Sequence, residues 1–331
     1  MEKTVLVLGA SGLFGSHAAR AFEEAGWTVR RYRRGSDMGA AAQGAQVIVN
    51  GLNPPKYHAW ARLIPQITSQ AISAARASGA TLIIPGNVYV FGDQSGPWGP
   101  DTPHLPVSRK GRIRAEMEAA YADAARGGMQ VITLRAGDFI APASAGTILN
   151  MLVLKDLQKG TITSIGDPSA RRAYAYLPDL ARAAVALADR RAALPRFADV
   201  PFPGLAFSTL DMKRELERQT GGALKVRPFN WLLMRLMSPV WELAREFSEM
   251  RYLYETPHSL SAEVFDRLLP GFAATPFEQV VAEHLSYQGK PISTQTSRWR
   301  DAASTVARNG SSGPGQTTPA PIMASSAEGR M

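Results

Sequence analysis

The sequence of 331 residues is 45% hydrophobic and 20% charged, a composition typical of globular proteins that indicates neither wholesale disorder nor a membrane-embedded chain. It contains no cysteine, which excludes disulfide bonds, thiolate metal ligands and a cysteine nucleophile. The net charge of +9 comes from short, separate groups of Lys and Arg with no nucleic-acid-binding motif among them, so we expect no nucleic-acid partner.

The first half of the sequence alternates short β-branched runs with longer alanine-rich segments. This alternation predicts βαβ units and therefore a doubly wound α/β fold with a parallel sheet. Its strands are continuous apolar runs, as expected when helices cover both faces of the sheet. We expect strands at residues 5–8, 28–32, 47–50, 81–85 and 130–135, and helices at residues 13–25, 60–78 and 113–126.

The alternation weakens from about residue 137, where Pro and Gly separate shorter segments. We expect a first core over residues 1–165, to which segments at about 170–200 return, including a helix at 178–188. Residues 166–290 are predicted to form a smaller, interleaved C-terminal region. Residues 291–331 are rich in Ser, Thr, Gly, Pro and Ala. They bury too little apolar surface to offset the conformational entropy lost on ordering, which predicts a disordered tail.

Two apolar segments bear on localisation. The run that follows Met1 lacks the length and cleavage site of a signal peptide, so we expect a cytoplasmic protein. The most hydrophobic later segment, residues 231–243, is interrupted by Arg235, Pro239 and Glu242 and falls short of the roughly 20 apolar residues that a membrane span requires. We therefore expect no stable membrane insertion and interpret this segment as a packed helix, with association at a membrane surface as the alternative.

A glycine-rich turn lies between the first strand and the first helix, with the spacing GxxGxxG. Gly9 permits a tight turn, Gly12 lets the backbone approach a pyrophosphate, and Gly15 lets helix and strand pack closely. The helix that follows presents free N–H groups to an anion. The turn therefore predicts a Rossmann-type unit that binds an adenine dinucleotide. The turn residues predicted to contact it are Gly9, Ser11, Gly12, Leu13, Phe14 and Gly15.

The end of the second strand is rich in arginine where an NAD-specific fold usually places an acid for the ribose 2′-hydroxyl. No acid occurs there before Asp37. The planar guanidinium of arginine suits a 2′-phosphate. We therefore expect Arg33 and Arg34 to bind this phosphate and NADP to be the cofactor, with NAD as the alternative.

Four more segments accompany the turn in chain order: residues 47–51 (VIVNG), 83–92 (IIPGNVYVFG), 135–142 (RAGDFIAP) and 174–181 (YAYLPDLA). Together they resemble the short-chain dehydrogenase/reductase superfamily, in its extended or atypical branch of epimerases and dehydratases acting on nucleotide sugars. The resemblance runs from about residue 3 to residue 285. It implies a Rossmann core that binds a nicotinamide dinucleotide, with cofactor contacts at Asn50, Gly51 and Leu52, and a substrate side in residues 166–290.

The catalytic residues depart from this family's pattern of a Tyr with a Lys four residues later, assisted by a Ser or Thr. Alignment from Gly92 places Asn87 at the Ser/Thr position. Alignment from Glu116, taken as the acid that follows the motif, places Ser108 at the tyrosine and Arg112 at the lysine. The expected triad is therefore absent.

Tyr89 is the nearest substitute, because a serine hydroxyl has no comparable acidity without an adjacent base. On a strand, Asn87 and Tyr89 would point to the same face at its C-terminal end, where ligands bind in this fold. Tyr89 is then a general acid, a substrate contact or a packed aromatic. Arg112 cannot shuttle protons but could contact a cofactor ribose or a substrate phosphate. The polar stretch 108–116 around it predicts anion binding.

The remaining polar residues give fewer signals. Asp138 and Asp179 are expected to be structural caps, and the five histidines lack metal-ligand spacing, so we expect no metal.

Two functions stay open. The first is an NADP-dependent oxidoreductase or epimerase-like enzyme acting on a small carbonyl or nucleotide-linked sugar. The second is a sensor or scaffold protein that binds NADP without turnover. The substrate stays unknown and a homodimer is left open.

Overall fold

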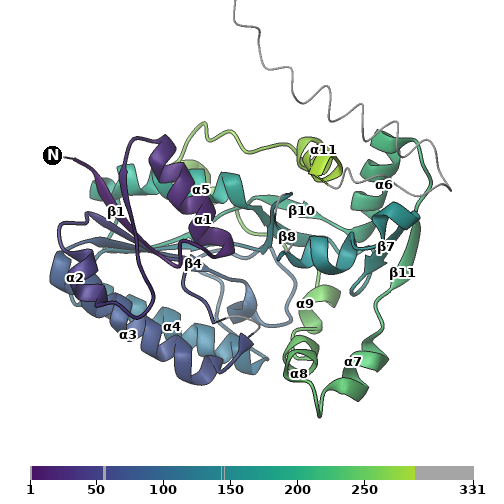
Figure 1. Cartoon of the computed structure of the whole chain (residues 1–331), viewed down its shortest axis with the longest axis horizontal. Helices are drawn as coiled ribbons and strands as arrows, with labels where there is room; N and C mark the ends of the chain where they lie inside the picture. The colour runs from purple at the N-terminus through teal and green to yellow at the C-terminus, as the bar shows by residue number, and fades with distance from the viewer. Residues whose placement is uncertain (1, 55–56, 143, 145, 288–331) are drawn as a thin grey trace, which may run out of the picture.

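The computed structural model describes residues 2–54, 57–142, 144 and 146–287 (Figure 1). The predicted disordered tail, residues 291–331, lies outside the described residues.

A six-stranded parallel sheet forms the central layer of the fold, in the order β2-β1-β3-β4-β5-β9. The chain leaves β1 for β2 on one side and then places β3 on the other side of β1. This reversal of strand order opens a crevice at the C-terminal ends of β1 and β3. The predicted doubly wound α/β fold is confirmed. The strands are β1 (Thr4–Leu8), β2 (Thr28–Arg31), β3 (Val47–Asn50), β4 (Thr81–Gly86), β5 (Val131–Arg135) and β9 (Phe197–Pro201).

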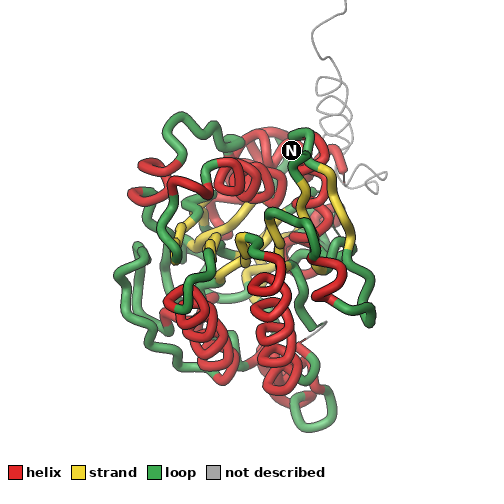
Figure 2. The backbone as a smooth tube through the Cα atoms, turned by 90° about the vertical axis from the view of Figure 1, so that its left-hand side faces the viewer, coloured by secondary structure: helices red, strands yellow, loops and turns green. Residues whose placement is uncertain are grey.

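Helices cover both faces of this sheet, and Figure 2 shows the strands between them. In β1, Val5 and Val7 enter the core under α1 and α5, whereas Leu6 and Leu8 enter the core on the other face. A strand buried on both faces has no polar alternation, which explains its apolar sequence. One face carries α1 (Leu13–Glu24) and α5 (Leu177–Asp189), and the other carries α2 (Met38–Ala42), α3 (Trp60–Ser78) and α4 (Arg109–Arg126) (Figure 1).

The second part of the molecule is built from residues after β5. The helix α5 and the strand β9 return to the large sheet, while the other elements form two small sheets and a group of helices. The small sheets contain β6 (Asp138–Ile140), β8 (Arg172–Tyr176) and β10 (Leu205–Phe207), and β7 (Thr161–Ser164) and β11 (Lys225–Pro228). The helices are α6 (Thr209–Thr220), α7 (Trp231–Met237), α8 (Glu242–Ser248), α9 (Tyr252–Glu255), α10 (Glu263–Leu268) and α11 (Phe277–Tyr287).

Two sequence interpretations need correction. The strand β4 ends at Gly86, and residues 89–91 form a short 3-10 helix, so Asn87 and Tyr89 are not alternate residues of a strand.

Residues 231–243 are not a packed helix: α7 ends before Pro239, and most of its apolar side chains are exposed. Among the described residues, no helix is long and apolar enough to cross a membrane.

One buried histidine makes the stability of the fold depend on pH. His258 is 6% exposed, stacks on Trp98 with 4.6 Å between ring centroids, and donates from Nδ1 to the Thr256 carbonyl oxygen at 2.8 Å. Burial lowers the pKa of His258 from 6.5 to about 4. The unfolded chain therefore binds more protons between these pH values. Stability is full above pH 6.5 and is lost as the pH falls towards 4, by up to about 3 kcal/mol.

We expect His258→Gln to flatten the pH dependence of the unfolding free energy between pH 6.5 and 4. Urea unfolding at several pH values measures this slope. The control is His58→Gln, because the His58 side chain is 64% exposed. Equal slopes in the wild type and His258→Gln would contradict the assignment.

Candidate functional site

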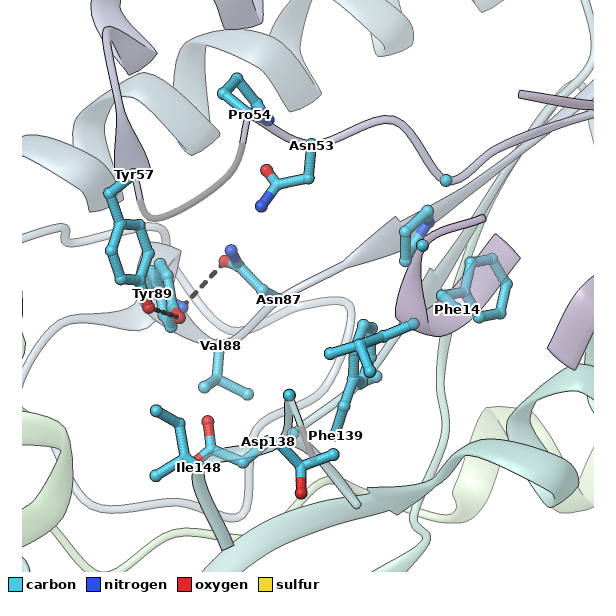
Figure 3. Close-up of a pocket in the computed structure, with 18 of the residues that line it drawn as sticks. Phe14, Asn53, Pro54, Tyr57, Asn87, Val88, Tyr89, Asp138, Phe139 and Ile148 are labelled. Atoms are coloured by element: carbon cyan, nitrogen blue, oxygen red, sulfur yellow. Dashed lines mark hydrogen bonds between the residues drawn. The ribbon is translucent and has the colours of Figure 1, made fainter. Parts of the chain in front are cut away.

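A cavity of about 1490 Å³ lies at the C-terminal edge of the large sheet. Its walls come from the glycine turn, from the ends of β3, β4 and β5, and from α3 and α4. It continues past β6 and residues 146–158 to α7 and α8. Figure 3 shows Asn87, Tyr89 and Asp138 around the same space. One cavity therefore connects the predicted dinucleotide turn with polar side chains from both parts of the molecule.

The glycine turn has the close backbone approaches that its sequence predicts. Gly9 has a φ of +73°, and the Gly12 N–H donates to the Gly9 carbonyl oxygen at 2.8 Å. A Cβ on Gly15 would lie 2.2 Å from the same oxygen. The helix α1 then begins with no side-chain cap and no acid in its first turn, which leaves its N–H groups free for an anion. Gly12, Leu13 and Phe14 line the cavity.

Gly15→Ala is expected to destabilise the fold by about 1–3 kcal/mol, because the new Cβ meets backbone that cannot move aside. Binding of a nicotinamide dinucleotide should weaken with it. Thermal unfolding and calorimetric titration measure the two effects. In the control Gly99→Ala, the Cβ would lie 3.6 Å from the Ser261 Cβ, an ordinary contact. A Gly15→Ala variant with the stability and affinity of the control would contradict this reading.

The end of β3 lies directly beside the turn, since a Cβ on Gly9 would lie 2.8 Å from the Gly51 carbonyl oxygen. The side chain of Asn50 donates to the Tyr121 hydroxyl at 3.1 Å and accepts from the Leu52 N–H at 3.2 Å. A Cβ on Gly51 would lie 3.1 Å from the Leu8 carbonyl oxygen. Asn50, Gly51 and Leu52 all line the cavity, so the structure brings these predicted cofactor contacts to the turn.

The arginines after β2 fall into two groups. Arg30 donates to the Gln43 carbonyl oxygen at 2.7 Å, and Arg31 forms an ion pair with Glu23 at 2.7 Å. Arg33 and Arg34 are exposed beyond the end of β2, and no side-chain hydrogen bond or ion pair joins them to another described residue. The strand β2 pairs with β1, and β1 leads into the glycine turn. These two cations therefore follow the strand next to the one that carries the turn.

Asn87 and Tyr89 both line the cavity, although the backbone that carries them is not a strand. The Asn87 side-chain oxygen accepts from the Tyr89 N–H at 3.0 Å and so fixes the bend after β4. The Tyr89 hydroxyl lies 3.3 Å from the Tyr57 hydroxyl. Burial, reinforced by Tyr57 and Asp138, raises the pKa of Tyr89 well above its usual range. Tyr89 therefore keeps its proton near neutral pH and can donate a hydrogen bond.

The structure does not bring Arg112 to the cavity. Ser108 is the N-cap of α4, accepting from the Gly111 N–H at 3.0 Å, while Arg112 and Glu116 are exposed. The buried acid of this helix is instead Glu118, which forms an ion pair with Arg135 at 2.7 Å. The alignment from Glu116 therefore used the wrong acid.

The same spacing counted from Glu118 places Arg114 at the lysine position and Lys110 at the tyrosine position. Arg114 lines the cavity, where its guanidinium lies 5.0 Å from the centre of the Trp60 ring and donates to Asn53 at 3.2 Å. Lys110 is fully buried and forms ion pairs with Glu246 and, at 2.5 Å, with Glu249. Of the basic residues in the predicted anion-binding stretch 108–116, only Arg114 reaches this cavity.

Asp138 is a site residue that the sequence analysis interpreted as a cap. It lines the cavity at the start of β6, and its carboxylate pairs with Arg172 at 3.1 Å. Burial raises the pKa of Asp138 and the neighbouring Arg172 opposes the rise. Its position three residues after the end of β5 was the available signal, because ligands bind beyond the carboxyl ends of strands. By contrast, Asp179 ties α5 to Thr275, accepting from its N–H at 2.6 Å.

Within the residues that the structure describes, no group of three or more His, Asp or Glu side chains could hold a metal ion.

The fold and the crevice define a Rossmann-type α/β protein. Residues 65–199 match the model of the NAD dependent epimerase/dehydratase family, and the resemblance to the extended short-chain dehydrogenase/reductases is confirmed. No curated protein matches the sequence significantly.

Three solved structures illustrate the likeness of the fold. UDP-glucuronic acid 4-epimerase from Bacillus cereus, in complex with UDP-glucuronic acid and NAD, has a TM-score of 0.69 at 17% identity over 86% of this chain and 98% of that chain. The Bordetella bronchiseptica enzyme WbmH, in complex with NAD+, has a TM-score of 0.64 at 17% identity over 87% and 98%. UDP-glucose 4-epimerase from Brucella ovis, in complex with NAD, has a TM-score of 0.65 at 17% identity over 85% and 97%.

Proposed function

We propose that this protein is a nicotinamide-dinucleotide-dependent enzyme of the epimerase or oxidoreductase type, which uses NADP(H) in preference to NAD(H). Its substrate class is a small carbonyl compound or a nucleotide-linked sugar. One observation carries the proposal: a single cavity joins the glycine turn to the polar group of Asn87, Tyr89 and Asp138. The family match over residues 65–199 supports it.

The residues at the crevice fit a dinucleotide. A Cβ on Gly12 would lie 3.2 Å from the Gly9 carbonyl oxygen, a tight contact, and glycine leaves the backbone here open to a pyrophosphate. The turn residues and Asn50, Gly51 and Leu52 would hold the cofactor. A bound nicotinamide supplies reversible hydride transfer.

The cavity residues divide the remaining work. The Tyr89 hydroxyl, which keeps its proton, donates a hydrogen bond to a substrate oxygen. Burial raises the pKa of Asp138 towards neutral pH, so its carboxyl takes a proton from the substrate hydroxyl or returns one to it. Arg114 is a permanent cation that binds an anionic group of the substrate. In this assignment Tyr89 and Asp138 replace the family's tyrosine from other elements, while Arg114 occupies the position of the family's lysine.

Turnover tests the enzyme assignment. The full chain is incubated with NADPH or NADP and a panel of aldehydes, ketones, alcohols and UDP-sugars, and nicotinamide absorbance and sugar epimerisation are followed. Turnover of at least one substrate class is expected. Tight NADPH binding without turnover across the panel would instead favour the non-catalytic sensor or scaffold.

Cofactor preference depends on Arg33 and Arg34. We expect the double variant Arg33→Ala/Arg34→Ala to weaken NADPH binding by roughly 10–100-fold, because charge-assisted hydrogen bonds to the 2′-phosphate are lost. NADH binding should stay unchanged. Calorimetric titration measures both. Arg31→Ala is the matched control, since Arg31 is paired with Glu23. If the double variant kept the wild-type preference, these arginines would not bind the phosphate.

A further inference from the structure

Exposed apolar side chains gather on one segment of the molecule. Among the described residues, ten large hydrophobic side chains are exposed, and six of them lie between residues 232 and 241. This segment joins α7 to α8, and together they form a projection that we call the α7–α8 hairpin, residues 231–248 (Figure 1). Contiguous exposed apolar surface of this kind marks an interaction site. The six residues are Leu232, Leu233, Leu236, Met237, Val240 and Trp241.

The charges around this apolar surface are mainly positive. Between residues 225 and 248 the sequence has four basic residues, Lys225, Arg227, Arg235 and Arg245, and two acids, Glu242 and Glu246. The four basic residues and Glu242 are exposed, and Glu242 lies 3.2 Å from His58. Glu246 is buried, where it pairs with Lys110 and lies 3.8 Å from Arg245. Leucine and tryptophan beside exposed arginine is the composition of interfacial helices that rest on anionic lipid.

The same charges disfavour a second copy of this chain as the occupant. In a symmetric dimer the same patch of each protomer would face its partner. Arg235 would then approach the basic residues of the other protomer, and Glu242 is the one exposed acid of the hairpin that could balance them. A bilayer that contains anionic lipid offers both an apolar interior and phosphate groups, so it complements the whole patch.

The inner side of the hairpin belongs to the cavity. Met234, Leu243 and Phe247 line it, and Trp241 both lines it and is 46% exposed. The cavity therefore reaches the surface within the apolar patch.

We propose that the α7–α8 hairpin docks the protein on the surface of an anionic lipid bilayer, without crossing it. The leucines, Val240 and Trp241 enter the boundary between headgroups and acyl chains, while Arg235 and Arg245 contact lipid phosphates. This contact brings the opening of the cavity to the bilayer. The proposal stands independently of the enzyme assignment.

Vesicle flotation of the full chain tests the docking. We expect binding to vesicles of phosphatidylcholine with about 30% phosphatidylglycerol, and weaker binding to phosphatidylcholine alone. Leu232→Asp/Leu236→Asp should lower the apparent affinity at least about tenfold, because apolar contacts are lost and negative charge is added. The matched control is Leu105→Asp/Val107→Asp, which changes two exposed apolar residues at another site and should bind as the wild type does.

Further variants separate the contributions and protect the test against misfolding. Arg235→Gln/Arg245→Gln should lower affinity for anionic vesicles by roughly tenfold and remove the preference over neutral ones. Val240→Asp changes a residue that is 81% exposed in the turn, so its loss of binding would not reflect a damaged core. Circular dichroism checks that each variant is folded.

Three results would overturn the proposal. The first is wild-type protein that does not float with anionic vesicles. The second is an equal loss of binding in the hairpin variants and the Leu105→Asp/Val107→Asp control. The third is self-association, measured by sedimentation, that Leu232→Asp/Leu236→Asp abolishes while no vesicle binding occurs; the patch would then be an interface between copies.

Discussion

Replacing Asp138 by asparagine is expected to slow turnover by roughly 10²–10⁴-fold while leaving NADPH affinity within about threefold of the wild type. The asparagine keeps the volume of the side chain and an acceptor for Arg172, but it cannot take up a proton. Asp138 lies in the cavity at the start of β6 and is not one of the turn residues, so cofactor binding should persist. Steady-state kinetics and calorimetric titration measure the two quantities separately.

The pH dependence of kcat tests the role of Asp138 a second time. Because burial raises the pKa of Asp138, its carboxyl keeps its proton to a higher pH than an ordinary aspartate. In the reaction direction that needs a base, kcat should rise with pH through this raised pKa, and the rise should vanish in Asp138→Asn. Asp179→Asn is the control, because Asp179 is a buried carboxylate outside the cavity lining. Unchanged kcat in Asp138→Asn would remove Asp138 from the mechanism.

Arg135→Met is expected to lower the free energy of unfolding by about 3–5 kcal/mol. Arg135 is 1% exposed and pairs with both Glu118, at 2.7 Å, and Asp199, at 2.5 Å. Methionine fills much of the space but leaves two acids in the interior without their cation. Arg135 also donates to the Asn87 carbonyl oxygen at 2.8 Å, so the loop at the cavity should lose its position and turnover should fall as well.

Urea unfolding measures the stability change, with Arg135→Met/Glu118→Gln as the partner variant. Removing the charge of Glu118 should restore more than about 1 kcal/mol, since one of the two uncompensated acids is gone. Arg135→Met within about 1 kcal/mol of the wild type would show that the buried ion pairs contribute little.

The local sequence pattern was enough to predict the large parallel sheet and the helices that cover it. The inner strands β1 and β3 are buried on both faces, so each is a short, mainly apolar run, and the glycine turn marks where β1 ends. The predicted helix 60–78 has the bounds of α3, Trp60–Ser78. The predicted helix 113–126 begins four residues later than α4, whose N-cap is Ser108.

Tertiary pairing decided what the sequence pattern could not. Two acids, Glu116 and Glu118, lie in the same helix, and only contact with Arg135 on β5 distinguishes them. A shift of two residues turns a helix position by about 200°, which is why Arg112 is exposed and Arg114 lines the cavity. Likewise, Asp138 meets Arg172 only because β6 and β8 are neighbours.

Hydrophobic content was the least reliable guide to burial. Residues 231–243 are as apolar as a core helix, and composition alone cannot distinguish a side chain that packs inside the protein from one that faces another apolar phase. The break at Pro239 and the single charge on α7, Arg235, were the visible signs that this segment is not an ordinary core helix.

Calorimetric titration of the full chain with NADPH and with NADH tests the central claim most directly, because the proposed chemistry depends on a dinucleotide at the glycine turn. We predict saturable binding of one dinucleotide per chain, tighter for NADPH than for NADH and weakened in Gly15→Ala. No saturable binding of either dinucleotide would contradict the account, and equal affinities would contradict its assignment of Arg33 and Arg34.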